Sequence, residues 1–336
     1  MAKLGAAVIG ANMGAGHAVG YVNNPHTELR AVCDLNLESA QRLAAAHGAA
    51  VATANWEELL RRDDIQIVSV ATPDPLHAPM TVACLEAGKH VLCEKPMALT
   101  LPECEEMIAA ADRTGKLLMV GQVCRFAPGF RLTKHLIERG EIGELFFVES
   151  EYAHDYTHAV GAGNWRKDPK IKREPFVGGA CHAVDLVRWI AGNMVECFAY
   201  SNHKVLTDWP VDDCTIATYK FENGVIGKVM CSIGCKRPYT MRSVFYGSKG
   251  TIISDNTSPS IQLYTQDLPT TLDWITLPVN LASHNVAAEI DELVACIVEG
   301  RPLATDGREG ARTVAACRAA VESAATGKPV AVRTEF

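Results

Sequence analysis

The sequence predicts an α/β protein of two domains: a doubly wound parallel sheet at the N-terminus, followed by an α/β domain built on an open, mostly antiparallel sheet. Three observations favour this fold. The chain has 336 residues, 48% of them hydrophobic, which is enough for two cores. Short apolar runs alternate with helical patterns up to about residue 121, and longer alternating stretches follow. We place the domains at 1–122 and 123–336.

The first domain contains five predicted strands separated by amphipathic segments. The helical segments include "LESAQRLAAAHG" and "PECEEMIAAADRTG". The strands are nearly continuous apolar runs, which is typical of a parallel sheet covered on both faces. The five runs are "AAVIG", "LRAVCD", "IQIVSVA", "KHVLCE" and "LLMVG".

The second domain has alternating apolar and polar positions, which indicate half-buried strands. Asn223-Gly224 lies between two such runs and predicts a hairpin. Helices are expected near 180–191, 284–298 and 308–326. The predicted strands lie in "ELFFVESEY", "ECFAY", "TIATYKFENGVIGKVMCS" and "RSVFYGSKGTIIS".

Composition argues against several classes of partner. The chain has 32 Lys and Arg against 39 Asp and Glu, so it lacks the basic excess that nucleic-acid binding uses. It has neither a signal-peptide pattern nor a run of about 18 apolar residues to span a membrane, so we expect a cytoplasmic protein. The 12 cysteines are scattered and are expected to be buried free thiols. Cys231 and Cys235 lack a second pair or a nearby histidine, so we expect no structural metal.

The stretch "AAVIGANMGAGHA" joins the first strand to a helix through a glycine-rich turn. Backbone N–H groups of such a turn approach a pyrophosphate at the positive end of the helix. Aligned with GxGxxG/A, Gly10 takes the first place, Asn12 the second and Ala15 the third. We therefore expect Gly10, Asn12 and Met13 to bind a dinucleotide. The alternative is a tight turn without a ligand.

Asp34 ends the second strand 24 positions after Gly10, where a carboxylate accepts hydrogen bonds from both hydroxyls of an adenosine ribose. This carboxylate would repel a 2′-phosphate, and Leu35 and Asn36 bring no positive charge. The sequence therefore favours NAD over NADP as the cofactor. The alternative role of Asp34 is to cap the helix that begins in "LNLESAQRL".

Polar residues also follow the third predicted strand, in "SVATPDPLHAPM". The carboxyl ends of parallel strands form the edge where open α/β sheets bind ligands. We therefore expect Thr72, Pro73 and His77 to lie beside the cofactor or the substrate. Alternatively, His77 only caps or packs against the next helix.

Glu94, Lys95 and Pro96 follow the fourth predicted strand at the same edge. Pro96 cannot continue the hydrogen bonding of a strand, so it ends the strand and fixes the direction of Lys95. A partly buried ammonium there stabilises a developing alkoxide and lowers the barrier to hydride departure. The alternative is an exposed Lys95 that pairs with Glu94.

His182 lies in the first turn of a helix predicted within "FVGGACHAVDLVRWIAG". The positive helix end and partial burial both disfavour a charged imidazole, and a neutral imidazole suits a general base for an alcohol proton. Alternatively, His182 packs without a catalytic role. Asp185 and Arg188 share its helix face, and for these two we prefer an ordinary surface or interdomain ion pair.

Three segments, "ATPDPLH", "CEKPMAL" and "GKLLMVGQVCRFAP", resemble the family of glucose-fructose oxidoreductase, inositol dehydrogenase and MocA. The resemblance covers essentially the whole chain. It implies an N-terminal Rossmann domain, a C-terminal α/β domain used for oligomerisation as a homodimer or homotetramer, and pyridine-nucleotide chemistry on sugars or cyclic polyols. It also implies that Lys95 contacts the reacting hydroxyl and that Glu94 lies near the nicotinamide.

One departure from the family pattern concerns the substrate site. The family has an Asp four residues before the His, and this chain has Gly178 there. Three possibilities follow: His182 works alone, another group substitutes, or the reaction differs from plain alcohol oxidation.

Candidates for the missing group lie in "EYAHDYTH", where strand alternation would send His154 and Asp155 to opposite faces. We consider Asp155 and Tyr156 as substrate contacts. In "NWRKDP", Trp165 offers a stacking surface and Arg166 an anion contact, or both belong to a packed loop.

The leading hypothesis is an NAD-dependent oxidoreductase that acts on a hydroxyl carbon of a sugar or cyclic polyol, with Lys95 stabilising the alkoxide and His182 exchanging the proton. A second hypothesis is redox-neutral: transient oxidation acidifies a neighbouring C–H, a glycosidic substituent leaves, and the hydride returns. A third is a dinucleotide-binding sensor without turnover, which the presence of Lys95 and His182 disfavours. The sequence leaves the substrate, its stereochemistry and the direction of flux open.

Overall fold

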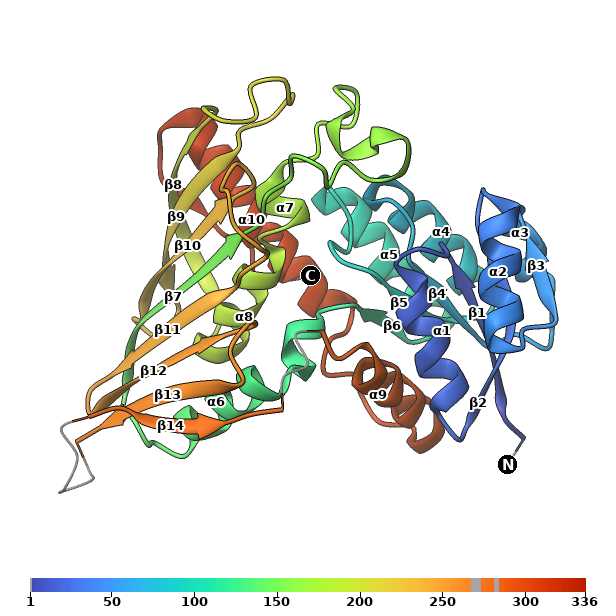
Figure 1. Ribbon diagram of the computed structural model, residues 1–336, viewed down its shortest axis with the longest axis horizontal. Coiled ribbons are helices and arrows are strands. Elements are labelled where there is room, and N and C mark those ends of the chain that lie inside the picture. Colours follow the sequence, from blue (N-terminus) through green and yellow to red (C-terminus); the bar gives the residue numbers. More distant parts are fainter. Residues whose placement is uncertain (1, 267–272, 281–283) are drawn as a thin grey trace. The chain divides into compact units, whose positions relative to one another are not determined.

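The computed structural model describes residues 2–266, 273–280 and 284–336 (Figure 1). The chain forms two compact units. The first contains the chain up to residue 122, together with 285–311 and residue 336, and the second contains 123–284 and 312–335. The sequence predicted a second domain over all of 123–336, whereas residues 285–311 belong to the first unit.

The first unit is built on a six-stranded sheet in the order β3-β2-β1-β4-β5-β6, and every pair in it is parallel. This confirms the predicted doubly wound sheet. Strand β3 was not predicted, because its sequence, Val-Ala-Thr, is not a continuous apolar run. The strands are β1 (Leu4–Ile9), β2 (Thr27–Cys33), β3 (Val51–Thr53), β4 (Ile67–Val70), β5 (His90–Cys93) and β6 (Leu118–Val120).

Helices cover this sheet and include one contributed by a distant part of the chain. Helix α9 (Val286–Glu299) packs against α1 (Gly14–Asn23), where a Cβ built on Gly20 would lie 2.8 Å from Cγ1 of Ile290. The small residues of α1 therefore allow α9 to approach closely. The other helices of the first unit are α2 (Leu37–His47), α3 (Glu57–Leu60), η1 (Asp74–Leu76), α4 (His77–Glu86) and α5 (Leu101–Thr114).

The second unit contains a nine-stranded sheet in the order β14-β13-β12-β11-β7-β10-β9-β8-β15. Only the pairing of β7 with β10 is parallel among the described strands, so the predicted mostly antiparallel sheet is confirmed. The strands are β7 (Leu145–Ala153), β8 (Met194–Asn202), β9 (Cys214–Phe221), β10 (Ile226–Ser232), β11 (Arg242–Gly247), β12 (Gly250–Asp255), β13 (Ser260–Thr265), β14 (Ile275–Pro278) and β15 (Val330–Ala331).

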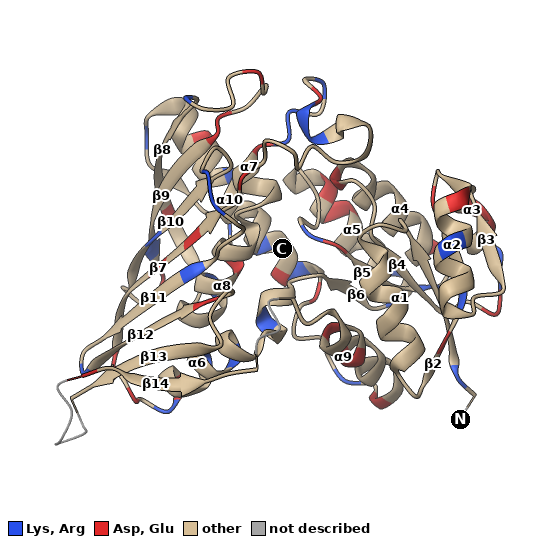
Figure 2. Cartoon of the chain, in the orientation of Figure 1, with Lys and Arg blue, Asp and Glu red and all other residues tan. Residues whose placement is uncertain are grey.

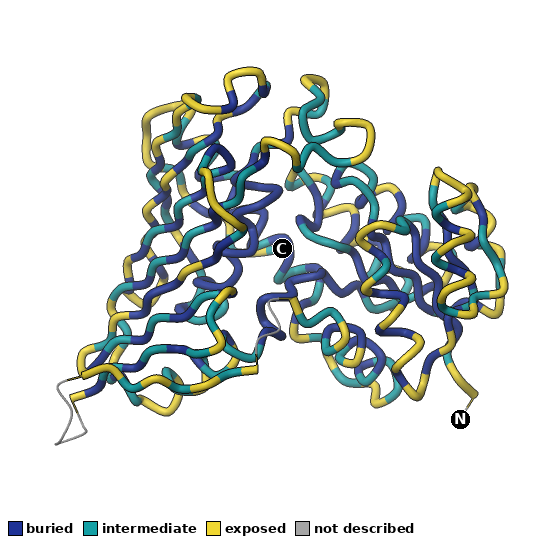
Figure 3. Tube along the Cα trace, viewed as in Figure 1, coloured by how far each residue is buried: buried dark blue, intermediate teal, exposed yellow. Residues whose placement is uncertain are grey.

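One face of this sheet is covered by helices and the other is open. Helix α8 (Cys181–Ala191) contacts β7, and the hydroxyl of Tyr219 on β9 donates to the carbonyl of Ala316 on α10 (Gly307–Thr326). Burial alternates along the strands, as Figure 3 shows. The remaining helices are η2 (Val123–Phe126), α6 (Pro128–Glu138), η3 (Ala162–Lys167) and α7 (Pro175–Gly178).

The open face mixes ion pairs with exposed apolar side chains. Lys228 pairs with Glu149 at 2.9 Å, and Lys220 pairs with Glu196 at 2.5 Å. Exposed apolar residues on this face include Tyr200, Ile216 and Ile226.

The local predictions for the second domain are confirmed. The hairpin at Asn223-Gly224 joins β9 to β10, and Gly224 has a positive φ of 87°. The three predicted helices correspond to α8, α9 and α10.

Of the 12 cysteines, ten are buried, and Cys214 and Cys235 are half-buried. Among residues 2–266, 273–280 and 284–336, every helix falls short of the length or the hydrophobicity that crossing a bilayer requires. Within those same ranges, His, Cys, Asp and Glu form no group of three that suits a metal ion. The expectations of a cytoplasmic location and of no metal remain predictions.

Two glycines of α1 offer a matched test of helix-to-strand packing. A Cβ on Gly14 would lie 2.2 Å from Cγ1 of Val8, whereas the nearest atom to a Cβ on Gly16 is 3.7 Å away. We expect Gly14→Ala to destabilise the first unit by about 1–3 kcal/mol. Gly16→Ala should be neutral or stabilise by up to about 1 kcal/mol, because Ala favours a helix. Thermal unfolding midpoints measure both changes, and equal midpoints for the two variants would contradict this packing.

Candidate functional site

The glycine-rich turn follows β1 and leads into α1. Gly10 has a φ of 101°, and a Cβ there would lie 2.3 Å from the carbonyl oxygen of Ala71, so only glycine fits. The close helix-to-strand approach is made by Gly14. The sequence alignment that gave the third place to Ala15 was therefore wrong. Asn12, which takes the place of the second glycine, does not have a positive φ.

Asp34 links the end of β2 to this turn. One carboxylate oxygen accepts from the N–H of Ala11 at 2.8 Å, and the other accepts from the N–H of Asn36 at 2.8 Å. The alternative helix-cap role is wrong, because Asn36 caps α2 by accepting from the N–H of Ser39. Each carboxylate oxygen has a second lone pair, so Asp34 can also accept ribose hydroxyls.

The first unit carries features that fit a dinucleotide. Helix α1 begins at Gly14, its N-cap residue Met13 makes no side-chain cap, and its first turn has no acidic residue, so its positive end suits a pyrophosphate. Thr72 follows β4, and its Oγ1 is buried without a hydrogen-bond partner in the described part of the chain. A buried hydroxyl without a partner is costly, and a ligand oxygen would satisfy it. Pro73 comes next and is half-buried.

Glu94 and Lys95 follow β5 at the same edge of the sheet, as predicted. Glu94 accepts from the backbone N–H of Lys95 at 3.1 Å and lies 3.1 Å from Nε2 of His17. Burial alone would raise the pKa of Glu94, but the hydrogen bond and charge of His17 and the charge of Lys95 lower it to about 2. Lys95 is half-buried, and no ion pair joins its ammonium to Glu94 or to another described residue. The alternative of an exposed Lys95–Glu94 pair is therefore wrong.

Sequence reasoning missed the buried network behind Glu94. Nδ1 of His17 lies 3.0 Å from Oγ of Ser69, which lies 2.8 Å from the hydroxyl of Tyr21. Glu289 on α9 is fully buried beside this network, and neither of its carboxyl oxygens has a hydrogen-bond partner among the described residues. Burial and the charge of Glu94 raise the pKa of Glu289 well above its usual value. These residues come from distant parts of the chain and contact one another only in the folded protein. The spacing of residues in the sequence therefore does not indicate the network.

His77 joins the two turns that carry Thr72 and Lys95. Its Nδ1 lies 2.7 Å from the carbonyl oxygen of Pro96, and its Nε2 lies 2.9 Å from the carbonyl oxygen of Thr72. A carbonyl only accepts, so both ring nitrogens must donate, and the ring carries a positive charge. Burial opposes this charge, but Cys93, Asp74 and the Pro96 carbonyl raise the pKa of His77 to about 10. His77 therefore holds together the two turns that follow β4 and β5 at this edge of the sheet.

His182 occupies the first turn of α8, as predicted, and is 4% exposed. Its Nδ1 lies 3.6 Å from Sγ of Cys124. The ring stacks on Tyr152 with centroids 6.4 Å apart, and the ring of His284 lies 5.2 Å away. His182 thus lies among polar aromatic groups.

Tyr156 belongs to the same aromatic cluster, whereas Asp155 does not. The hydroxyl of Tyr156 lies 2.9 Å from that of Tyr152. Asp155 accepts from the hydroxyl of Thr157 and pairs with Lys236, and the Thr157 hydrogen bonds lower its pKa to about 2. Strand β7 ends at Ala153, so the strand alternation invoked for 154 and 155 does not apply.

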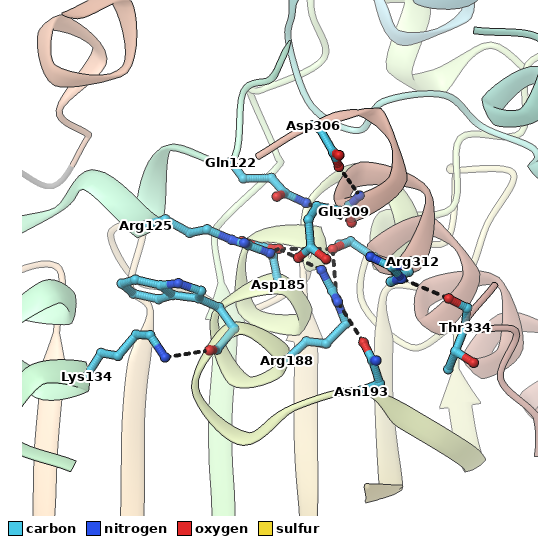
Figure 4. Close-up of polar contacts among 12 residues, drawn as sticks. Gln122, Arg125, Lys134, Asp185, Arg188, Asn193, Asp306, Glu309, Arg312 and Thr334 are labelled. Atoms are coloured by element: carbon cyan, nitrogen blue, oxygen red, sulfur yellow. Dashed lines mark hydrogen bonds and ion pairs between the residues drawn. The ribbon is translucent and has the colours of Figure 1, made fainter. Parts of the chain in front are cut away.

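Asp185 and Arg188 do not form an ordinary surface or interdomain pair, so that interpretation was wrong. Asp185 is 1% exposed and accepts from Nε and Nη2 of Arg125 at 2.9 and 2.6 Å. Thr313 donates to the same carboxylate at 3.0 Å, and Arg188 lies 3.9 Å from it (Figure 4). A buried bidentate pair fixes orientation, and removing one partner from such a pair costs about 3–5 kcal/mol. This cluster holds α8, and with it His182, against η2.

Trp165 and Arg166 lie in η3, in a loop rich in aromatic and basic side chains. The guanidinium carbon of Arg166 lies 5.2 Å from the centre of the Trp165 ring. Arg173 lies 5.3 Å from the same ring. Gly178, where the family pattern has Asp, adjoins Arg173, whose Nη2 donates to the Gly178 carbonyl at 2.6 Å.

Comparison with protein families matches both parts of the chain. The profile described as "Oxidoreductase family, NAD-binding Rossmann fold" matches residues 4–122, and "Oxidoreductase family, C-terminal alpha/beta domain" matches residues 134–332. The chain belongs to the glucose-fructose oxidoreductase, inositol dehydrogenase and MocA family. The resemblance drawn from sequence is confirmed, and the protein is an NAD-dependent oxidoreductase with NAD as its cofactor.

Individual relatives include sugar-converting enzymes. The 1,5-anhydro-D-fructose reductase of Ensifer adhaerens is 30% identical, with 87% of this chain and 89% of that protein covered. The levoglucosan dehydrogenase of Pseudarthrobacter phenanthrenivorans is 27% identical, with 75% of this chain and 74% of that protein covered. A solved levoglucosan dehydrogenase in complex with NADH and L-sorbose has a TM-score of 0.90 at 24% identity, covering 99% of this chain and 100% of that one, which shows the shared fold.

The charge of His77 is open to direct measurement. Because its pKa is raised from 6.5 to about 10, the stability it contributes is fully present below pH 6.5 and is lost as the pH rises through 10. In histidine labelled with ¹⁵N, we expect both ring nitrogens of His77 to remain protonated at pH 8.5. The exposed His26 gives the comparison signal in the same spectrum. A His77 ring with one unprotonated nitrogen at pH 8.5 would contradict the assignment.

Proposed function

We propose that this protein transfers a hydride between NAD and a hydroxyl-bearing carbon of a sugar or cyclic polyol. The half-buried Lys95, held at the carboxyl edge of the nucleotide-binding sheet, is the observation that supports this reaction most strongly. Relatives named for levoglucosan and 1,5-anhydro-D-fructose support the carbohydrate class.

We infer that the cofactor contacts are made at the carboxyl edge of the first sheet. The turn at Gly10, Asn12 and Met13 would face the pyrophosphate, and Asp34 the adenosine ribose. NAD supplies the hydride acceptor when bound. Three further residues lie at or just beyond the ends of β4 and β5 and are proposed for the nicotinamide half: Thr72, Pro73 and Glu94.

Lys95 and His182 have different roles in the proposed reaction. The ammonium of Lys95 donates to the substrate oxygen and stabilises the negative charge that develops there. His182 takes the hydroxyl proton as a general base, which a buried ring at the positive end of α8 suits. Glu94, ionised at all working pH values, fixes the backbone of Lys95 by accepting its N–H.

Side chains around the aromatic cluster of the second unit are proposed to hold the carbohydrate. Tyr156 and Trp165 offer ring faces for its apolar surface, and Arg166 and Asp155 offer polar contacts. Burial raises the pKa of Tyr152 and Tyr239 well above the usual value, so these hydroxyls act as neutral hydrogen-bonding groups rather than as bases.

The redox-neutral reaction stays a second candidate because Gly178 stands where the family pattern has Asp. A chain without that carboxylate has one fewer group to accept a proton. NADH that accumulates in step with product supports net oxidation. Release of a glycosidic substituent without accumulated NADH supports the redox-neutral route.

The homodimer or homotetramer stays a proposal supported by the open face of the second sheet, where exposed apolar residues lie among ion pairs. Light scattering of the full chain tests it, and a monomer at micromolar concentration would refute it.

The test of the catalytic assignment uses Lys95→Met and His182→Asn, with the exposed Lys328→Met and His26→Asn as matched controls. A panel of free sugars, cyclic polyols and glycosides is incubated with NAD while NADH and released sugar are followed together. Each catalytic variant should lower kcat by about 10²–10⁴-fold and leave NAD affinity nearly unchanged. The controls should retain wild-type rates. Near-normal rates for both catalytic variants would place the chemistry elsewhere.

A further inference from the structure

The segment before α7 concentrates positive charge in a chain of net charge −7. Residues 166–173 read "RKDPKIKR", with five basic side chains and one acidic side chain. Figure 2 shows blue segments along this loop. Most basic residues of such a loop are solvated, but the first and last, Arg166 and Arg173, turn toward the protein.

Arg173 fills the space that a side chain at position 178 would occupy. A Cβ built on Gly178 would lie 2.1 Å from Cζ of Arg173 and 2.4 Å from its Nε. Arg173 is 3% exposed and donates to the Gly178 carbonyl at 2.6 Å. The absence of a side chain at 178 therefore admits a guanidinium there. A cation stands where the family pattern has a carboxylate.

A second guanidinium belongs to the same group. Arg166 and Arg173 lie 5.2 and 5.3 Å from the centre of the Trp165 ring. Arg166 donates through Nη1 to the carbonyl of Ala159 at 3.1 Å, while its Nε is buried without a hydrogen-bond partner in the described part of the chain. Burying a charged donor without an acceptor is costly, so this nitrogen points to an acceptor that a ligand supplies.

Carboxylates of the surrounding segments are bound to cations other than Arg166. Asp208 pairs with Lys167, Asp155 pairs with Lys236 at 3.2 Å, and Glu174 pairs with Arg318 at 3.2 Å. None of these three carboxylates therefore accepts a hydrogen bond from the buried Nε of Arg166.

This arginine group adjoins the proposed catalytic histidine. Gly178 is the last residue of α7, and His182 follows four residues later in the first turn of α8. A Cβ on the intervening Gly179 would lie 2.7 Å from Cε1 of Tyr152, and the Tyr152 ring stacks on His182. Arg166 also lies over the ring of Tyr156, 5.9 Å from its centre. A negatively charged substrate bound at His182 would therefore be attracted by both guanidiniums.

We propose that Arg166 and Arg173 bind the carboxylate of a sugar acid, so that the substrate is a uronic or aldonic acid rather than a neutral sugar. This inference rests on the proposed function of His182 and Lys95. A planar guanidinium matches the two oxygens of a carboxylate, and both guanidiniums lie within about 5.3 Å of the centre of the Trp165 ring.

The test compares D-glucuronate, D-galacturonate and D-gluconate with D-glucose, myo-inositol and D-glucose 6-phosphate, each with NAD. The variants are Arg173→Gln and Arg166→Gln, with the exposed Lys328→Gln as the control. For a sugar acid, each arginine variant should raise KM about 10- to 100-fold with a smaller change in kcat. For a neutral sugar, the same variants should raise KM by a smaller factor than they do for a sugar acid. The control should change neither.

The outcomes separate this inference from the proposed function. Oxidation of neutral sugars in preference to acids would overturn the arginine site and leave the hydride-transfer proposal standing. Preference for the sugar phosphate would overturn the carboxylate assignment. If no compound is oxidised, the binding of glucuronate to the full chain is measured by calorimetry. Binding that Arg166→Gln weakens supports the arginine site. Absence of binding overturns it. Arg166 is half-buried, so its variant keeps the test usable if Arg173→Gln fails to fold.

Discussion

The hydrogen bond from the Ala11 N–H to the Asp34 carboxylate is the interaction on which the nucleotide site depends. It ties the turn after β1 to the end of β2, two neighbouring strands whose carboxyl ends the parallel sheet brings to one edge. Gly10 makes the bond possible, because only a residue without a side chain adopts its backbone conformation against the Ala71 carbonyl. The same carboxylate then places a negative charge where an adenosine ribose would lie. In the proposed cofactor site, Asp34 would therefore act both on the choice of cofactor and on the geometry of the turn.

Elsewhere in each unit, buried polar and charged groups also fix the positions of neighbouring side chains and turns. His77 holds the carbonyls beside Thr72 and Lys95, and His17 holds the Glu94 carboxylate. In the second unit, Arg125 holds Asp185 and so fixes α8. Each of these groups loses hydration on burial and regains hydrogen bonds only in one geometry, so the arrangement fixes orientation more than it adds stability. Under the proposed function, Lys95 and His182 are thus positioned by partners that do not themselves react.

Much of the fold followed from the sequence, because strand alternation and helix periodicity are local. The prediction of the parallel sheet, the hairpin at Asn223-Gly224 and α8 needed no tertiary information. The errors came from through-space contacts. Spacing could not show that α1 begins at Gly14, and a charged residue such as Asp185 is normally exposed, so its burial against Arg125 was unexpected. The network of Tyr21, Ser69 and Glu289, and the guanidinium of Arg173 beside Gly178, join residues whose contact no sequence pattern records.

The identity of the cofactor tests the central claim most directly, because it depends on the charge of Asp34 rather than on any substrate. Calorimetric titration of the full chain with NAD and with NADP measures it. The account predicts that NADP binds at least about tenfold more weakly than NAD, since its 2′-phosphate would approach the Asp34 carboxylate. It also predicts that Asp34→Asn reduces the difference in affinity between NAD and NADP. Equal or tighter binding of NADP to the unaltered protein would contradict the account.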